Sequence, residues 1–188
     1  MNGLEQAAWE IHNFFSDQDI PYMVIGILAV QYWAEPRYTQ DVDLTVSAPF
    51  AGLTEFIGQI LDYFSPRLEN ALEFARLNRV VLVKSSNGYP LDIALGLPRY
   101  EGEAIRRAVD INLAPGTAIR VCSAEDLIIQ KTIAGRAQDI RDIEGIVYRQ
   151  GAALDSAYIR QWLLEFMELL VRPEISDLFE APWRKIQE

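Results

Sequence analysis

The sequence predicts an α/β fold: a mixed β-sheet of about four or five strands flanked by helices, followed by a helical segment from Ser123 onward. Short apolar segments typical of buried strands recur as far as Cys122. Between them lie segments whose apolar residues have helical spacing. After Cys122 only the helical spacing continues. We therefore expect a core over residues 1–122 and a C-terminal helical segment over residues 123–188 that packs on it as one compact unit.

The individual elements follow from periodicity and from turn residues. The run from Ser85 to Gly88 is rich in residues that favour a hairpin turn. Ser123 begins a helix, with Asp126 at the position of a capping box, and Asp155 caps a further apolar helix. We expect strands at 22–27, 42–46, 79–84, 91–95 and 118–122, and helices at 1–17, 28–33 and 49–64.

The charge of the chain limits its partners. The formal net charge is −10, and neither part of the chain is basic. Because non-specific nucleic-acid binding depends on Lys and Arg, a long duplex is disfavoured as the main ligand. Arg99, Arg106 and Arg107 form a local basic group that could hold part of a tRNA, but we interpret it as a solvated helix face. No apolar run is long enough for a membrane span, and we expect a cytoplasmic protein.

Two residue types narrow the possible chemistry. Cys122 is the only cysteine, which excludes an intrachain disulfide and a zinc site built from cysteines. His12 is the only histidine and is best interpreted as structural. A general base in this protein is therefore expected to be a carboxylate.

Carboxylates also stand out on the predicted strands. Asp41 and Asp43 lie two residues apart, so on a strand they point to the same side with Cα atoms about 6–7 Å apart. Two such carboxylates can converge on a hard cation such as Mg²⁺. An isolated pair of this kind is also explained by turn-forming aspartates at a strand end. Asp92 is a lone acid between Leu91 and Ile93 in an otherwise apolar strand.

The residues around this pair form a longer motif that resembles the nucleotidyltransferase superfamily, in particular the small bacterial AbiEii-like and minimal nucleotidyltransferases. The family pattern has a second small residue after Gly26, where this chain has Ile27, and often a glycine where it has Ala34. A second, helical motif of the family also has counterparts. The matching positions are Gly26, Ala29, Pro36, Arg37, Thr39, Asp41, Asp43 and Leu44 in the first motif, and Glu125, Asp126, Leu127, Lys131, Arg136, Asp139 and Asp142 in the second.

The resemblance implies a Mg²⁺-dependent nucleotidyltransferase, with Mn²⁺ as a possible substitute. Asp41, Asp43 and Asp92 are then the metal ligands and catalytic residues. The implied acceptor of the nucleotide is the hydroxyl of an RNA end, a protein or a small molecule. The NTP is expected to contact Gly26, Ile27, Arg37, Thr39, Lys131 and Asp139, although Arg136, Asp139 and Asp142 also have the spacing of ordinary side-chain pairs on a helix.

Two other functions stay open at this stage. Ile27 adds a branched side chain at the expected phosphate turn, and the alternative function is a catalytically impaired binding or regulatory module that acts through a protein partner. The apolar helix after Asp155 also suits docking onto an antitoxin or onto a second copy, as in a toxin–antitoxin or phage-defence pair.

Overall fold

The computed structural model describes residues 1–187, and these residues form two compact units. Unit 1 comprises Met1–Leu28 and Tyr38–Cys122, and unit 2 comprises Ala29–Arg37 and Ser123–Glu188. The chain therefore leaves unit 1 for nine residues, returns to it, and passes to unit 2 again after Cys122.

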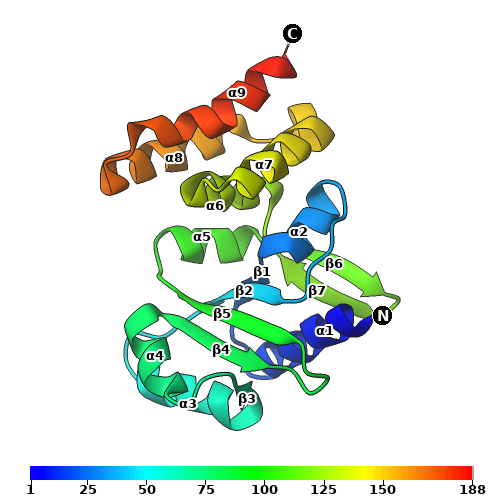
Figure 1. The fold of residues 1–188 in the computed structure, drawn as a ribbon, viewed down its shortest axis with the longest axis vertical. Coiled ribbons are helices and arrows are strands. Elements are labelled where there is room, and N and C mark those ends of the chain that lie inside the picture. Colours follow the sequence, from blue (N-terminus) through cyan, green and yellow to red (C-terminus); the bar gives the residue numbers. More distant parts are fainter. Residues whose placement is uncertain (188) are drawn as a thin grey trace. The chain divides into compact units, whose positions relative to one another are not determined.

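Unit 1 is built on one mixed sheet (Figure 1). Along residues 1–187 its seven strands have the order β3-β4-β5-β2-β1-β7-β6. The neighbours β2 and β5, and β1 and β7, are parallel, and the other pairs are antiparallel. The strands are β1 (Tyr22–Val24), β2 (Val42–Ser47), β3 (Ser65–Pro66), β4 (Val80–Lys84), β5 (Pro90–Gly96), β6 (Val109–Ala114) and β7 (Thr117–Val121).

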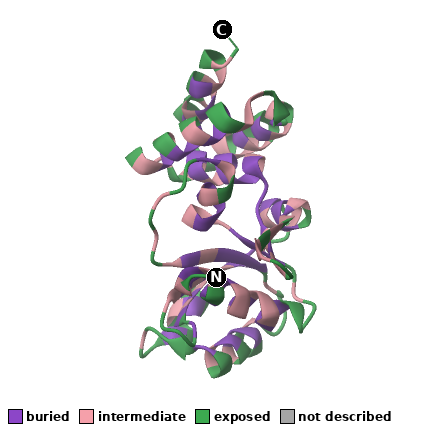
Figure 2. Ribbon diagram, turned by 90° about the vertical axis from the view of Figure 1, so that its right-hand side faces the viewer, coloured by how far each residue is buried: buried purple, intermediate pink, exposed green. Residues whose placement is uncertain are grey.

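The two faces of this sheet differ in composition. On β2 the residues Val42, Leu44 and Val46 are fully buried, and the apolar residues of β5 have the same alternation. Because side chains alternate along a strand, Asp43 and Asp92 lie on the opposite face. Figure 2 shows the central strands as the most continuously buried part of this unit.

Helices cover both faces of the sheet. Helix α1 (Gly3–Ser16) contacts β2 and β7, α3 (Leu53–Tyr63) contacts β4, and α4 (Ala71–Asn78) contacts α3 and β4. Helix α5 (Tyr100–Arg107) contacts β1 and β2 from the side opposite α1 and α3 (Figure 1). An added Cβ at Gly96 would lie 2.9 Å from Thr45 Cγ2 and 3.1 Å from Glu101 Cβ. Thus α5 sits directly on the face that carries the acidic residues.

Unit 2 is helical. It contains α6 (Ala124–Ala134), α7 (Ala137–Gln150), α8 (Ser156–Leu170) and α9 (Asp177–Lys185), with short 3₁₀ turns η1 (Gly151–Ala153) and η2 (Pro173–Ser176). Helix α6 packs on α7 and α8, and α7 packs on α9. The last part of α2 (Gly26–Trp33) and the turn after it also belong to this unit.

The structure confirms the predicted α/β class and adds detail that the sequence did not give. The short edge strand β3 and the outer strand β6 were not expected. The predicted strand at 22–27 ends at Val24, and Phe50, expected on a helix face, precedes α3 and is exposed. The single helix expected after Ser123 is two helices, because Gly135 adopts φ +63° and ends α6. No helix within the described chain is long and apolar enough to cross a membrane.

Candidate active site

The centre of the candidate site in unit 1 is a pair of carboxylates on adjacent strands. Parallel strands β2 and β5 place Asp43 opposite Asp92 in register. Neighbouring strands lie about 4.8 Å apart, so the two side chains leave the sheet side by side on the same face. Both residues are partly exposed, whereas their neighbours Val42 and Leu91 are buried on the other face. The alternation of the strands thus brings together two acids that are 49 residues apart in the sequence.

Gly26 packs directly against Asp43. It adopts φ +65° at the start of α2, and an added Cβ would lie only 2.1 Å from Asp43 Oδ2. The preceding amide, that of Ile25, donates a hydrogen bond of 2.9 Å to the carbonyl oxygen of Asp43. A side chain at position 26 would be excluded both by the positive φ and by this contact. Ile27, the departure from the family pattern, is partly buried in the first turn of the helix.

Asp41 directly precedes the strand that carries Asp43 and is not part of it. Strand β2 begins at Val42, so the prediction that Asp41 and Asp43 share one regular strand holds only for Asp43. The Asp41 carboxylate accepts a hydrogen bond of 2.5 Å from Thr39 Oγ1. Thr39 therefore orients Asp41 in this structure.

Arg67 is a member of the site that the sequence did not indicate. Its guanidinium forms an ion pair with the Asp92 carboxylate. The backbone amide of Arg67 donates a hydrogen bond of 3.0 Å to Leu82 on β4, and Leu82 is the register partner of Asp92. Arg67 thus reaches Asp92 across one strand. It is 25 residues from Asp92 in the sequence, and no local pattern connects the two.

These residues provide the donor set that Mg²⁺ prefers. Carboxylate oxygens suit a hard cation better than they suit zinc. Asp43 and Asp92 can share such an ion, with Asp41 as the third donor. In the arrangement described here Arg67 engages Asp92 and Thr39 engages Asp41, and no group of three acidic, His or Cys side chains in residues 1–187 is already assembled around a common point.

The other predicted site residues lie in unit 2, where they form a buried network. Lys131 on α6 places its Nζ 3.0 Å from Asp139 Oδ1 and 2.7 Å from Asp142 Oδ2, both on α7. Arg37 adds two hydrogen bonds to Asp142, of 3.1 Å from Nε and 2.8 Å from Nη2. Only 3% of the Asp142 side chain and 11% of the Lys131 side chain are exposed.

Electrostatics in this network favour the ionised form of Asp142. Burial raises its pKa, but the hydrogen bonds from Arg37 and Lys131 outweigh burial and hold the pKa below its ordinary value. Asp139 also accepts a hydrogen bond of 3.2 Å from the backbone amide of Arg136 at the start of α7. The i,i+3 pair between Arg136 and Asp139 is present, whereas Asp142 pairs with Arg37 and Lys131 instead.

The predicted site residues therefore fall into two groups. Unit 1 holds the first group, which is Gly26, Ile27, Thr39, Asp41, Asp43 and Asp92. In unit 2, Asp142 joins Arg37 to Lys131, and Lys131 in turn pairs with Asp139. The helical motif contained Asp142, but we did not expect it as the centre of a network.

Comparison with known proteins shows the fold. No protein-family model and no curated protein matches the chain. Solved structures do match it. One is an antigenic nucleotidyltransferase-like protein from Paracoccidioides brasiliensis, 16% identical with a TM-score of 0.56, in an alignment that covers 95% of this chain and 92% of that one.

Two antibiotic-modifying enzymes are also similar in structure. The structure of ANT(2'')-Ia in complex with adenylyl-2''-tobramycin is 15% identical with a TM-score of 0.58, over 86% of this chain and 98% of that chain. The lincosamide antibiotic adenylyltransferase LnuA, with lincomycin bound, is 15% identical with a TM-score of 0.52, over 76% and 95% of the two chains. The chain thus has a nucleotidyltransferase-like fold.

Proposed function

We propose that this protein is a metal-dependent nucleotidyltransferase that moves a nucleoside monophosphate from an NTP to a hydroxyl group. The observation that carries the proposal is the pair Asp43 and Asp92, held in register on adjacent strands with Gly26 packed against Asp43. The similarity in fold to solved nucleotidyltransferases supports the same reaction class.

Asp41, Asp43 and Asp92 are the proposed ligands of Mg²⁺, with Mn²⁺ as a possible substitute. When bound, the metal neutralises charge on the phosphates and on the leaving pyrophosphate. Arg67 balances the charge of the Asp92 carboxylate in this structure, and it would have to release that carboxylate for Asp92 to hold a cation.

The chemical step is an in-line displacement. The acceptor hydroxyl oxygen forms a bond to the α-phosphorus, the bond from that phosphorus to the bridging oxygen breaks, and pyrophosphate leaves. The Asp92 carboxylate takes the hydroxyl proton. The N–H groups of Gly26 and Ile27, at the start of α2, are the proposed donors to the phosphates, because an unpaired helix N-terminus favours an anion.

Arg37, Thr39, Lys131 and Asp139 are proposed to position the NTP. Thr39 does so through Asp41, whose carboxylate it already contacts. Lys131 is paired with Asp139 and Asp142. Its proposed role in positioning the NTP therefore depends on these two carboxylates, which hold the ammonium group in one place.

The assignment to the AbiEii-like group rests on the motif from Gly26 to Leu44. With it we propose a cytoplasmic enzyme, which acts as the toxin of a toxin–antitoxin or phage-defence pair and has an antitoxin-like partner or a second copy. Expression of the wild type and of Asp43→Asn from an inducible promoter tests the toxin part. Growth arrest by the wild type alone supports it, and equal growth of both strains contradicts it.

A second candidate is a binding or regulatory module of the same fold that has lost turnover. The ion pair between Arg67 and Asp92 is the observation that favours it, because a cation already neutralises one of the catalytic carboxylates.

A transfer assay separates the two candidates. Each NTP, labelled at the α-phosphate, is incubated with Mg²⁺ and with RNA, protein or small-molecule fractions of a bacterial extract. Label that enters one fraction with the wild type but not with Asp43→Asn supports the transferase. Calorimetry that detects NTP binding without any transfer favours the binding module.

A further inference from the structure

Arg67 stands at one end of a row of side chains that crosses the sheet of unit 1. The register places Asp43 on β2 opposite Asp92 on β5, and Asp92 opposite Leu82 on β4. The register of β3 with β4, continued by one residue, places Arg67 opposite Leu82, and the hydrogen bond between their backbones agrees with this position. Residues opposite one another on neighbouring strands project from the same face. The four side chains therefore form one row on the face that carries the carboxylates.

The two ends of this row differ in chemistry. At the β2 end, Gly26 packs against Asp43 at the start of α2, where the N–H groups are the proposed donors to the phosphates. At the other end, Arg67 forms an ion pair with Asp92. Strand β1 leads to Gly26, and in the sheet β1 and β3 lie on opposite sides of the pair β2 and β5 (Figure 1). Arg67 thus reaches Asp92 from the side opposite the turn at Gly26.

The proposed displacement assigns one substrate to each end of the row. In phosphoryl transfer the attacking and leaving oxygens lie roughly in line, on opposite sides of the phosphorus. If pyrophosphate leaves on the side of Gly26, the acceptor hydroxyl arrives on the side of Asp92, which takes its proton. Arg67 contacts Asp92 on this same side. It therefore borders the space from which the acceptor arrives.

Arg67 would have to leave Asp92 when that carboxylate holds a cation, because the two positive charges would compete for the same oxygens. Across residues 1–187, Asp92 is the only side-chain partner of Arg67, and 28% of the Arg67 side chain is exposed. A guanidinium presents a planar fork that matches a carboxylate or a phosphate. An anion on the incoming substrate is therefore the natural replacement for Asp92.

Lys84 adds a second positive charge at this end of the row. It lies two residues beyond Leu82 on β4, so its side chain projects from the same face about 7 Å further along the strand. The residue is exposed and forms no ion pair within the described chain. A phosphate carries a charge of about −1.5 to −2, which two cations match better than they match a carboxylate. A polycation such as an aminoglycoside would be repelled.

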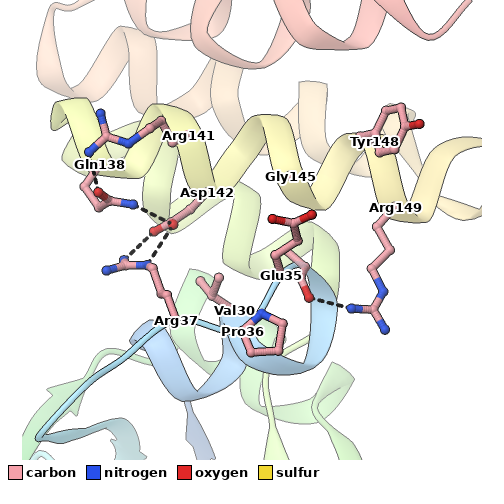
Figure 3. A pocket seen from close by; sticks show the side chains of 11 residues that line it. Val30, Glu35, Pro36, Arg37, Gln138, Arg141, Asp142, Gly145, Tyr148 and Arg149 are labelled. Atoms are coloured by element: carbon pink, nitrogen blue, oxygen red, sulfur yellow. Dashed lines mark hydrogen bonds and ion pairs between the residues drawn. The ribbon is translucent and has the colours of Figure 1, made fainter.

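Arginines of unit 2 provide a contrast. Arg37 is bound to Asp142, and Arg149 donates to the carbonyl oxygen of Ala34 (Figure 3). Neither partner is a proposed metal ligand, so metal binding at the carboxylate pair would free neither guanidinium. Arg67 differs from both because its partner is a carboxylate that the proposed reaction needs.

We propose that Arg67 is a positioning residue that exchanges Asp92 for a phosphate of the acceptor, with Lys84 as a second contact. This inference rests on the proposed transfer reaction. Because Arg67 borders Asp92, the phosphate lies only a few bonds from the attacking hydroxyl. A free nucleoside monophosphate and the end of an RNA strand share this chemistry.

Asp92→Asn tests the exchange without metal or NTP. It removes the charge that holds Arg67, so glycerol 3-phosphate should bind this variant about tenfold more tightly than the wild type. The Arg67 Nε–H signal of the ¹⁵N-labelled protein, assigned by its loss in Arg67→Gln, should shift during the titration. Asp110→Asn is the matched control, since it frees the guanidinium of Arg120 at the other edge of the sheet and should leave the Arg67 signal unchanged.

Further variants separate positioning from a structural role. In the Asp92→Asn background, Arg67→Gln should abolish the gain in affinity, and Arg67→Lys should keep part of it, because the charge remains without the fork. Lys84→Gln should weaken binding about threefold in the same background. Arg76→Gln removes an exposed charge on α4 and should have no effect.

The transfer assay identifies the source of the phosphate. Nucleoside 5′-monophosphates and a short RNA oligonucleotide are compared as acceptors, with the nucleosides as the acceptors that lack phosphate. Label in the oligonucleotide alone identifies a strand end, and label in a monophosphate identifies a free nucleotide. Arg67→Gln should raise the KM of the labelled acceptor about tenfold and leave the KM of the NTP within about twofold.

Four results would overturn the proposal: Asp92→Asn binds glycerol 3-phosphate no more tightly than Asp110→Asn does, the gain survives in Asp92→Asn/Arg67→Gln, glycerol binds as well as glycerol 3-phosphate, or nucleosides are labelled as well as the phosphorylated acceptors. An Arg67-dependent gain in a protein that labels no acceptor would support the phosphate site and count against the proposed transfer reaction.

Discussion

Asp142 is predicted to contribute strongly to the stability of unit 2. Only 3% of its side chain is exposed. Its carboxylate accepts hydrogen bonds of 2.8 and 3.1 Å from Arg37 and forms an ion pair of 2.7 Å with Lys131. Asp142→Asn keeps the shape of the side chain but removes its charge. Arg37 and Lys131 then both lose the Asp142 carboxylate, and Lys131 keeps only its ion pair with Asp139. Removing one partner of a buried ion pair costs about 3–5 kcal/mol, and the partial exposure of Arg37 places this case near 3 kcal/mol.

Unfolding followed by tryptophan fluorescence provides the assay, because Trp33, Trp162 and Trp183 lie in unit 2 while Trp9 lies in unit 1. A loss of about 3 kcal/mol corresponds to a drop of roughly 6–12 °C in Tm for a chain of this length. The matched control is Glu180→Gln, which removes the acid of an exposed ion pair with Arg160 and should cost less than about 1 kcal/mol.

The stability difference between the wild type and Asp142→Asn should depend on pH, which gives an independent check. The pKa of Asp142 is lowered in the folded protein, so its contribution to stability is present above its unfolded pKa of about 3.9 and is lost as the pH falls through the folded value. The gap between the wild type and Asp142→Asn should therefore close in strong acid. A loss similar to that of Glu180→Gln at neutral pH would refute the reasoning, because Asp142 would then not act as a buried charge.

Three further predictions concern unit 1. Gly26→Ala should abolish Mg²⁺-dependent NTP binding, because the added Cβ would lie 2.1 Å from Asp43 Oδ2 and position 26 has φ +65°. Calorimetry that finds wild-type NTP affinity in this variant would contradict the prediction. Arg67→Gln should bind Mg²⁺ alone about three- to tenfold more tightly than the wild type does, because the metal no longer displaces a guanidinium from Asp92. Arg76→Gln is the control for the lost charge, and equal affinities of the two variants would count against the prediction. Burial raises the pKa of Tyr22 to about 12, so its stabilising effect of about 2–3 kcal/mol should be present below pH 10 and lost between pH 10 and 12. Tyr22→Phe should lack this loss in alkaline unfolding curves, and a phenol that titrates near pH 10 in the folded protein would exclude the effect.

Much of the sheet in unit 1 could be predicted from local patterns. The alternation in β2 and β5 is visible in the sequence because one face is buried and the other is not. The strand β6 was missed although apolar residues at 109, 111 and 113 alternate with Asp110 and Asn112; none of its residues is fully buried. The break at Gly135 was missed because the apolar spacing continues on both sides of the glycine.

The candidate site was predictable where a residue belongs to a local motif or departs from the pattern of its own strand. The segment from Gly26 to Asp43 contains its own motif, and Asp92 stands out as an acid in an apolar strand. Arg67 reaches Asp92 across β4, and Arg37 reaches Asp142 over 105 residues. Such pairs depend on strand order and helix packing, which a single sequence does not reveal.

Lys131 shows a different limit. The helical motif suggested an ammonium directed at phosphates, and the side chain is instead buried between two carboxylates. Its spacing to Asp139 becomes a contact only because the chain reverses at Gly135. A role of Lys131 in NTP binding stays a prediction.

The most direct test of the central claim is calorimetry of each NTP with Mg²⁺, on the wild type and on Asp43→Ala. The account predicts that at least one NTP binds, that chelation of the metal prevents binding, and that Asp43→Ala abolishes it without altering the folded state. If no NTP binds to the wild type, or if binding is the same without Mg²⁺ and in Asp43→Ala, then the carboxylate pair on β2 and β5 is not a nucleotidyl-transfer site.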